Sequence, residues 1–136
     1  MSQEKKFRTR ANLRFSDFDL QGVLNSRQYI DLVAEARIDQ MRDCYKFPMD
    51  EFTNRGQTFI LSQFTIEYVK PVVFGTAVEV ETQITSIEGP IANIAFSFLS
   101  KNGEKLHAKG SVKYVLFDMK NQKTVAFTEE DKAAFI

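Results

Sequence analysis

Two carboxylates, Asp17 and Asp19, lie two residues apart in a short polar segment of the chain. The segment directly precedes a stretch with helical periodicity, and the first amide groups of a helix lack intrahelical partners and carry a partial positive charge. Acyl transfer needs a nucleophile or general base together with N–H donors that face the developing oxyanion. A carboxylate beside a helix start can supply both, so the pattern suits thioester hydrolysis.

The same spacing also has a purely structural interpretation. Aspartate side chains often hydrogen-bond to nearby backbone groups, so Asp17 and Asp19 could shape the turn and cap the helix without doing chemistry. The local pattern by itself leaves both interpretations open.

Other side chains that could react are expected to be structural. Glu35 and Arg37 fall on the predicted helix, where an ion pair or a contact between copies is expected rather than catalysis. The single histidine, His107, is in a predicted strand, opposite in phase to its neighbours, and a surface or interface position is expected. Three cations next to motifs or turns are phosphate-binding candidates, with solvated surface charge as the alternative: Arg27, Lys70 and Lys101.

The pattern of apolar residues predicts the elements that must hold these groups. Apolar and polar residues alternate over residues 7–15, which predicts a first strand. Turn-forming residues predict a loop over 16–25, and a long helix is expected over 26–45 with Ser26 as its cap. The apolar stripe of that helix is expected to comprise Ile30, Ala34, Ile38, Met41 and Tyr45.

Four further strands are expected after the helix, over residues 59–69, 78–87, 91–101 and 106–117. Asn102-Gly103 predicts a tight hairpin between the last two. Thr128 is followed three residues later by Asp131, a weak capping box that predicts a terminal helical turn over 128–135. This order predicts an α+β class, with a long helix packed on one face of a curved antiparallel five-stranded sheet.

Composition limits the domain number and the classes of partner. With 136 residues, we expect a single domain over residues 1–136. Lys plus Arg equals Asp plus Glu at 18 each, so the charge balance gives no reason to expect a nucleic-acid partner. There is no signal-peptide pattern and no run near the roughly 18 apolar residues of a membrane span, so a soluble cytoplasmic protein without a membrane partner is expected. Cys44 has no partner for an internal disulfide and is expected to be a packed thiol.

The polar segment resembles the signature of a known family. It reads Asp17-x-Asp19-x-x-Gly22-Val23-Leu24-Asn25-Ser26-x-x-Tyr29. This is similar to the Asp-x-Asp-x-x-Gly-x-Val-Asn-Asn-x-x-Tyr pattern of the 4-hydroxybenzoyl-CoA thioesterase-like branch of the hotdog superfamily. Downstream, Tyr68-x-x-Pro71 and the turn glycine Gly75 resemble the strand end and turn of the same family.

The resemblance implies a hotdog fold and an acyl-CoA thioesterase that works as a homodimer or homotetramer without a metal or other cofactor. It implies that Asp19 is the catalytic carboxylate, attacking the thioester carbonyl or activating water. The backbone N–H near Ser26 would polarise the carbonyl. Three more residues complete the substrate-binding set: Gly22 is expected to permit a turn, Asn25 to hold the loop or position the acyl group or water, and Tyr29 to bind substrate.

The chain departs from the family pattern at Val23, where many relatives carry His, and at Ser26, where many carry Asn. A noncatalytic acyl-binding or scaffolding protein therefore stays open, as does an acyl-carrier-protein thioesterase. A hydratase is less favoured because His107 is far from Asp19 in sequence. Asp17 is expected to order the loop, and the acyl chain that the protein prefers is not readable from the sequence.

Overall fold

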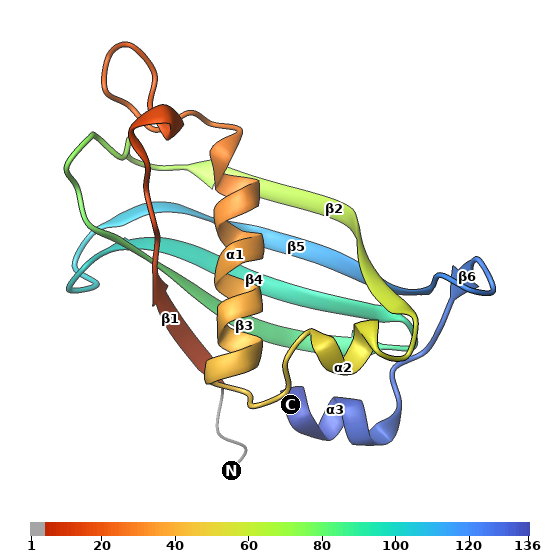
Figure 1. Ribbon diagram of the computed structural model, residues 1–136. Helices are drawn as coiled ribbons and strands as arrows, with labels where there is room; N and C mark the ends of the chain where they lie inside the picture. The colour runs from red at the N-terminus through yellow and green to blue at the C-terminus, as the bar shows by residue number, and fades with distance from the viewer. Residues whose placement is uncertain (1–4) are drawn as a thin grey trace.

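An antiparallel sheet wraps around one long helix in the computed structural model, which describes residues 5–136 (Figure 1). The elements are β1 (Lys6–Arg10), the 3-10 turn η1 (Phe15–Asp17), α1 (Gln28–Asp43), α2 (Asp50–Thr53), β2 (Gln57–Tyr68), β3 (Val78–Glu88), β4 (Ile91–Ser100), β5 (Leu106–Asp118), β6 (Lys123–Thr124) and α3 (Glu129–Phe135). None of the helices within residues 5–136 is long and apolar enough to cross a membrane.

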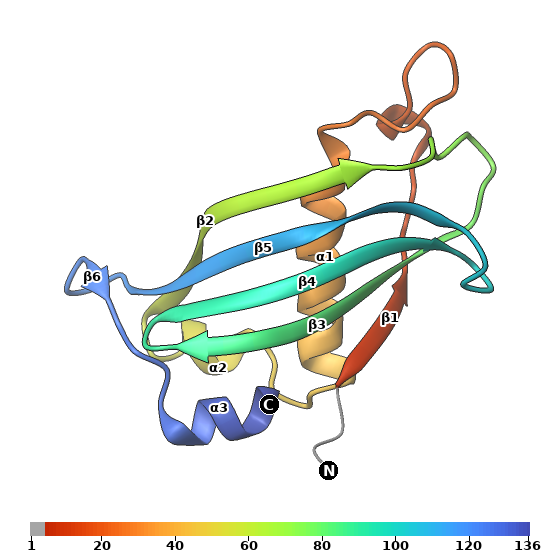
Figure 2. The same ribbon diagram turned by 180° about the vertical axis from the view of Figure 1, so that it is seen from behind.

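The sheet has the strand order β1-β3-β4-β5-β2, and the two-residue strand β6 pairs with the end of β5. Along β4 every second residue is buried, so one face of the strand covers the helix. The register of β2 shifts between Leu61 and Gln63, and the strand bends along its length (Figure 2). The expected α+β hotdog arrangement, a long helix held in a curved antiparallel sheet, is confirmed.

The four later strands begin and end within two residues of the predicted positions, whereas the first strand is shorter than predicted. Its partner β3 starts at Val78, and the amide of Ala11 makes the last contact with it. Exposure nevertheless alternates as far as Arg14, so the prediction of an inner and an outer face holds. After Ala11, no neighbouring strand continues the backbone pairing, and the chain enters the 3-10 turn η1. The short elements α2 and β6 were not predicted.

The predicted apolar stripe of the long helix is right at Met41 and Tyr45, which are buried, and wrong at Ile30 and Ile38. Ile30 is 36% exposed and Ile38 is 49% exposed. The buried face instead consists of Tyr29, Leu32, Val33, Ala36, Arg37, Gln40 and Met41. The prediction missed part of this face because it counted only apolar residue types, and the buried face contains an arginine and a glutamine.

Gln40 is fully buried, and both polar groups of its side chain have hydrogen-bond partners, as is usual for buried polar groups. Its Nε2 donates to the Thr9 hydroxyl at 3.0 Å and to the carbonyls of Phe7 and Val80 at 3.2 and 3.3 Å. The hydroxyl of Thr82 donates to its Oε1. This network ties the C-terminal half of α1 to β1 and β3.

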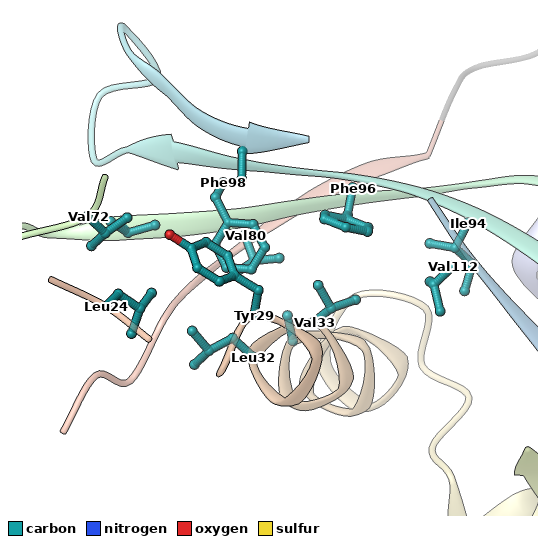
Figure 3. Packing of buried hydrophobic residues seen from close by; sticks show 13 residues of the cluster. Leu24, Tyr29, Leu32, Val33, Val72, Val80, Ile94, Phe96, Phe98 and Val112 are labelled. Atoms are coloured by element: carbon teal, nitrogen blue, oxygen red, sulfur yellow. The ribbon is translucent and has the colours of Figure 1, made fainter. Parts of the chain in front are cut away.

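The main core lies between the N-terminal half of α1 and the sheet (Figure 3). Tyr29 and Val33 point from the helix toward Val80, Phe96 and Phe98. The ring of Tyr29 lies 4.9 Å from that of Phe98, between ring centroids, in an edge-to-face contact. The start of α1 is therefore seated firmly on the sheet.

An aromatic cluster fills the opposite end of the molecule, where α2 and α3 lie beyond the end of α1 (Figure 1). Phe52 is fully buried there and contacts the rings of Phe47, Phe59, Phe127 and Phe135. The terminal helix was predicted, and its capping box is present, since Thr128 accepts a hydrogen bond from the Asp131 amide.

Two predictions about single side chains are corrected. Cys44 is exposed, because it caps α1 where the chain leaves the helix and turns through Lys46, whose φ is +59°. His107 is 4% exposed, not on the surface, and its Nδ1 lies 3.3 Å from the carbonyls of Lys70 and Pro71. The loop after β2 folds over this end of β5 and covers the ring.

Candidate active site

Asp19 closes a tight turn and leaves part of its carboxylate free. Its Oδ1 accepts hydrogen bonds from the amides of Gln21 at 2.9 Å and Val23 at 3.0 Å. The backbone also joins the two ends of the turn, because the amide of Asp19 donates to the carbonyl of Val23 at 2.9 Å. The residue is exposed, and Oδ2 has no hydrogen bond to any residue of 5–136. The turn thus fixes the side chain and leaves one oxygen available.

The turn is anchored to the loop between β2 and β3. Val23 pairs with Val73, and the amides of Leu24 and Phe74 donate to Val72 and Gly22 at 2.8 Å. These contacts join segments about fifty residues apart in sequence. The position of Asp19 therefore depends on the Tyr68–Gly75 region as well as on its own turn.

Asp17 orders the loop from the inside. It is 4% exposed, and its Oδ2 accepts a hydrogen bond from the amide of Arg14 at 2.8 Å. Its carbonyl accepts the amide of Asn25 at 3.0 Å. The two aspartates consequently occupy different environments: one carboxylate is buried in the loop, and the other faces solvent.

The start of α1 supplies amide groups close in sequence to this turn. The helix begins at Gln28, with Arg27 in the capping position and no side-chain cap, so the prediction that Ser26 caps the helix is wrong. Within residues 5–136, the amides of Ser26 and Arg27 donate no hydrogen bond. The Ser26 carbonyl accepts the Tyr68 hydroxyl at 2.8 Å, which fixes the direction of this peptide from β2.

The remaining predicted site residues have distinct placements. Gly22 has a φ of +77°, as the expected turn requires. Asn25 is half-buried, and its side-chain amide makes no hydrogen bond within residues 5–136. Tyr29 is 3% exposed and packs against Tyr68 and Phe98, and burial raises the pKa of its hydroxyl. Tyr29 therefore lies behind the site as a core side chain and offers no exposed surface to a ligand.

The helical pair Glu35 and Arg37 forms no ion pair. The two side chains leave α1 in different directions, since residues two apart do not face each other on a helix. Arg37 is buried and donates to the Thr82 hydroxyl at 3.2 Å, while Glu35 is exposed.

The three candidate phosphate-binding cations do not share a pocket. Lys70 lines a surface pocket of about 460 Å³ together with Lys105, Glu104 and His107. Arg27 and Lys101 are exposed and do not line this pocket, although Ser100 and Asn102, the chain neighbours of Lys101, do. Within residues 5–136, no group of three or more His, Cys, Asp or Glu side chains is arranged to hold a metal ion.

Sequence reasoning did not assign a role to Tyr68 or to the residues that follow it. Tyr68 was part of the motif that carries the resemblance, but only its distance from Ser26 reveals that it orients the helix start. Phe74, 53% exposed, packs with Phe15 and Phe18 beside the turn. The loop before α1 therefore carries an exposed carboxylate, and the chain where this helix begins has unpaired amides. These are the kinds of group that acyl transfer requires.

The chain matches the thioesterase-like superfamily over residues 13–135. A curated relative, the acyl-CoA thioesterase YbgC of Haemophilus influenzae, is 26% identical over 121 residues, which cover 89% of this chain and 88% of that protein.

Solved structures share the same fold. A DHNA-CoA thioesterase from Staphylococcus aureus aligns with a TM-score of 0.86 at 16% identity, covering 96% of this chain and 88% of that one. YbaW, a probable thioesterase from Escherichia coli, aligns with a TM-score of 0.80 at 20% identity, covering 93% and 94%. At these identities, the likeness establishes the fold alone.

Proposed function

Because the chain belongs to the thioesterase-like superfamily, we propose that it hydrolyses an acyl-CoA thioester to the free acid and CoA. The observation that carries this proposal is the exposed Asp19 carboxylate, held by two backbone amides in the loop that precedes α1. The acyl-CoA thioesterase name of the Haemophilus influenzae relative supports the choice of thioester.

Asp19 acts as nucleophile or as general base. In the first route, Oδ2 attacks the thioester carbonyl carbon, the C–S bond breaks and the CoA thiolate leaves, and water then hydrolyses the resulting anhydride. In the second route, Asp19 takes a proton from water as the water oxygen attacks the carbonyl, and collapse of the tetrahedral intermediate expels the thiolate. Both routes yield one carboxylic acid and one CoA thiol.

The oxyanion that forms in either route is stabilised by the backbone amide at Ser26. This amide is unpaired within residues 5–136, and the peptide that follows it, Ser26–Arg27, is oriented by the hydrogen bond from the Tyr68 hydroxyl to the Ser26 carbonyl. The partial positive charge at the start of α1 adds to the stabilisation. Gly22 holds the turn open, and the unengaged side-chain amide of Asn25 positions the acyl group or the attacking water.

The active form is a homodimer or a higher symmetric oligomer. The two edges of the sheet differ, because β1 carries Lys6, Arg8 and Arg10 whereas β2 exposes Ile60 and Leu61 at 44% and 42%. Charges protect an edge strand from pairing, and an apolar edge favours it. The helix face with Ile30 and Ile38 is also exposed, and Leu20, which follows Asp19, is fully exposed. A second copy along β2 would cover these groups and complete the acyl pocket.

The oligomer is tested by sedimentation velocity. Leu61→Lys on β2 should shift the protein toward monomer and lower turnover with it, whereas Arg8→Ala on the opposite edge should leave the assembly intact. A monomeric wild type would contradict this part of the proposal.

The thioesterase assignment is tested by measuring thiol release from short, long and aromatic acyl-CoAs by wild type and Asp19→Asn. Removal of a general base or nucleophile should lower kcat/KM by roughly a hundredfold or more. Asp31→Asn is the matched control, because Asp31 is an exposed acid in the first turn of α1.

Circular dichroism and oligomer size establish that the Asp19→Asn variant is folded. Equal activity of this variant and wild type would remove Asp19 from the mechanism. Acyl-CoA binding without cleavage would instead support a noncatalytic acyl-binding protein. The departures from the family pattern at Val23 and Ser26 are the reason to consider this alternative. Acyl-carrier-protein thioesters, assayed in parallel, decide which carrier is preferred.

A further inference from the structure

An apolar cavity lies beside the C-terminal half of α1. Its volume is about 220 Å³, and no residue of the Phe15–Arg27 loop lines it. Its walls come from α1, the sheet and the aromatic cluster, and all but two of the lining residues are apolar, among them Ala34, Ile38, Ile84 and Phe135. The two polar lining residues are Arg37 and Tyr114.

Arg37 is a buried cation with most of its hydrogen-bonding capacity unused. The residue is 6% exposed, and Nη1 donates to the Thr82 hydroxyl at 3.2 Å. Its guanidinium carbon lies 5.2 Å from the centre of the Tyr45 ring. A guanidinium carries five N–H donors, and no carboxylate of residues 5–136 forms an ion pair with this one.

A charge buried without a counter-ion is unfavourable, and one hydroxyl and one aromatic face offset only part of the lost hydration. Arg37 is thus a lining residue of the cavity, and no carboxylate in the described part of the chain pairs with its guanidinium. Tyr114 is the second donor. Burial raises the pKa of its hydroxyl, with Arg37 acting in the opposite direction, so the group stays protonated at neutral pH.

We propose that this cavity binds a hydrocarbon chain that ends in a carboxylate. The carboxylate is held by Arg37 in a charge-assisted, two-point contact and accepts a further hydrogen bond from Tyr114. The chain packs against the isoleucines and phenylalanines of the wall. Two sources share this chemistry: a free aliphatic acid, and an acyl thioester that carries a second carboxylate at its far end.

The binding arm compares octanoate with 1-octanol by isothermal titration calorimetry. Wild type should prefer octanoate by about tenfold or more, the effect of a hydrogen-bonded charge, and affinity should rise roughly three- to fourfold for each methylene from hexanoate to octanoate. Arg37→Gln should remove the preference for the acid while still binding the alcohol. Arg42→Gln, an exposed arginine on the same helix, should behave as wild type.

A second variant keeps the Arg37 guanidinium and fills the cavity with a larger side chain. Ala34→Phe places a ring into the cavity from α1 and should abolish binding of both octanoate and octanol. This variant keeps the proposal testable if Arg37→Gln does not fold. Octanoate binding to Ala34→Phe with wild-type affinity would overturn the proposal, as would an unchanged preference for the acid in folded Arg37→Gln.

The hydrolysis arm rests on the proposed thioesterase function and separates the two sources. It compares octanoyl-CoA with the CoA thioester of octanedioic acid. A higher wild-type kcat/KM for the second substrate, reversed in Arg37→Gln, assigns the cavity to the far carboxylate of the substrate. Octanoate binding through Arg37 with no such preference assigns it to a free acid.

Failure of the proposed thioesterase function gives a different result from failure of this inference. If neither thioester is cleaved but octanoate binds through Arg37, the cavity assignment stands alone. If wild type binds no acid and Arg37→Gln changes the oligomeric state, the unpaired cation belongs to a contact with a second copy, and the inference is overturned.

Discussion

The two ends of α1 are built in opposite ways. At the N-terminal end, the Phe15–Arg27 loop is held by backbone hydrogen bonds and leaves Asp19 and Leu20 exposed. At the C-terminal end, aromatic rings from distant parts of the chain exclude water, and Phe52 is fully buried. Backbone hydrogen bonds can fix the conformation of a loop that stays exposed to solvent. Aromatic rings stabilise the fold only where packing removes them from water.

This difference separates chemistry from stability along one helix. A carboxylate that acts on a substrate must stay accessible. Backbone hydrogen bonds within the Asp19 turn and from this turn to the loop after β2 set its position without burying it. The aromatic end carries no proposed reacting group and can contribute most to the free energy of unfolding. Substitutions at the two ends should therefore change different measured quantities.

The largest expected effect on stability is at the aromatic end. Phe52→Ala removes a fully buried ring that contacts four others and should lower the free energy of unfolding by about 3–5 kcal/mol. Phe15→Ala at the loop end is the control, because Phe15 is 83% exposed, and should cost below about 1 kcal/mol. Urea denaturation measures both, and equal losses would break the comparison.

The ion pair that holds α3 on the aromatic end should have the next largest effect. Arg55 contacts both carboxylate oxygens of Asp131, at 3.1 and 3.2 Å, and Thr128 donates to the same group. Burial acts to raise the pKa of Asp131, but Arg55 and Thr128 outweigh it and leave the pKa lowered. Because Arg55 is partly exposed, Asp131→Asn should cost only about 2 kcal/mol.

The lowered pKa of Asp131 sets the sign of a pH effect. Its contribution is present above the pKa of the unfolded chain, about 4, and is lost as pH falls through the lower folded value. Unfolding free energies measured from pH 6 down to pH 2 should thus converge for wild type and Asp131→Asn. Glu129→Gln, at a 92% exposed side chain, should leave the pH dependence unchanged. A constant gap between wild type and Asp131→Asn would contradict the pairing.

Two glycines with the same backbone angle provide a matched pair. Gly22 at the loop end and Gly56 at the aromatic end both have a φ of +77°. Alanine at either position should lower the free energy of unfolding by about 1 kcal/mol, since L residues are strained in this region. Only Gly22→Ala should also lower kcat/KM, because it reshapes the turn that holds Asp19. Loss of activity in both variants would mean that strain alone explains it.

The smallest effect is expected at Ser26. Its side chain makes no cap, and the proposed oxyanion donor is its backbone amide, so Ser26→Ala should lower kcat/KM by only a few fold and stability by less than about 0.5 kcal/mol. Thr128→Ala at the start of α3 removes a real cap and should cost about 1 kcal/mol. Thermal unfolding compares the two helix starts, and a larger loss at Ser26 would contradict the assignment.

Local patterns in the sequence determined most of the fold. Alternation predicted the strands, Asn102-Gly103 lies at the turn between β4 and β5, and Thr128 with Asp131 predicted the cap of α3. The turn around Asp19 was predicted from residues a few positions apart, whereas the role of Asp19 was expected only from the resemblance to a family signature. These features are set by interactions that neighbouring residues make with each other.

Only the tertiary structure decided which side chains meet across the chain. The buried face of α1 includes Arg37 and Gln40, because partners on β1 and β3 satisfy or surround them. His107 is buried because the loop after β2 closes over it, and Tyr68 orients Ser26 from forty-two residues away. Burial and long-range hydrogen bonds depend on what the folded chain brings alongside a residue, and no local pattern contains that information.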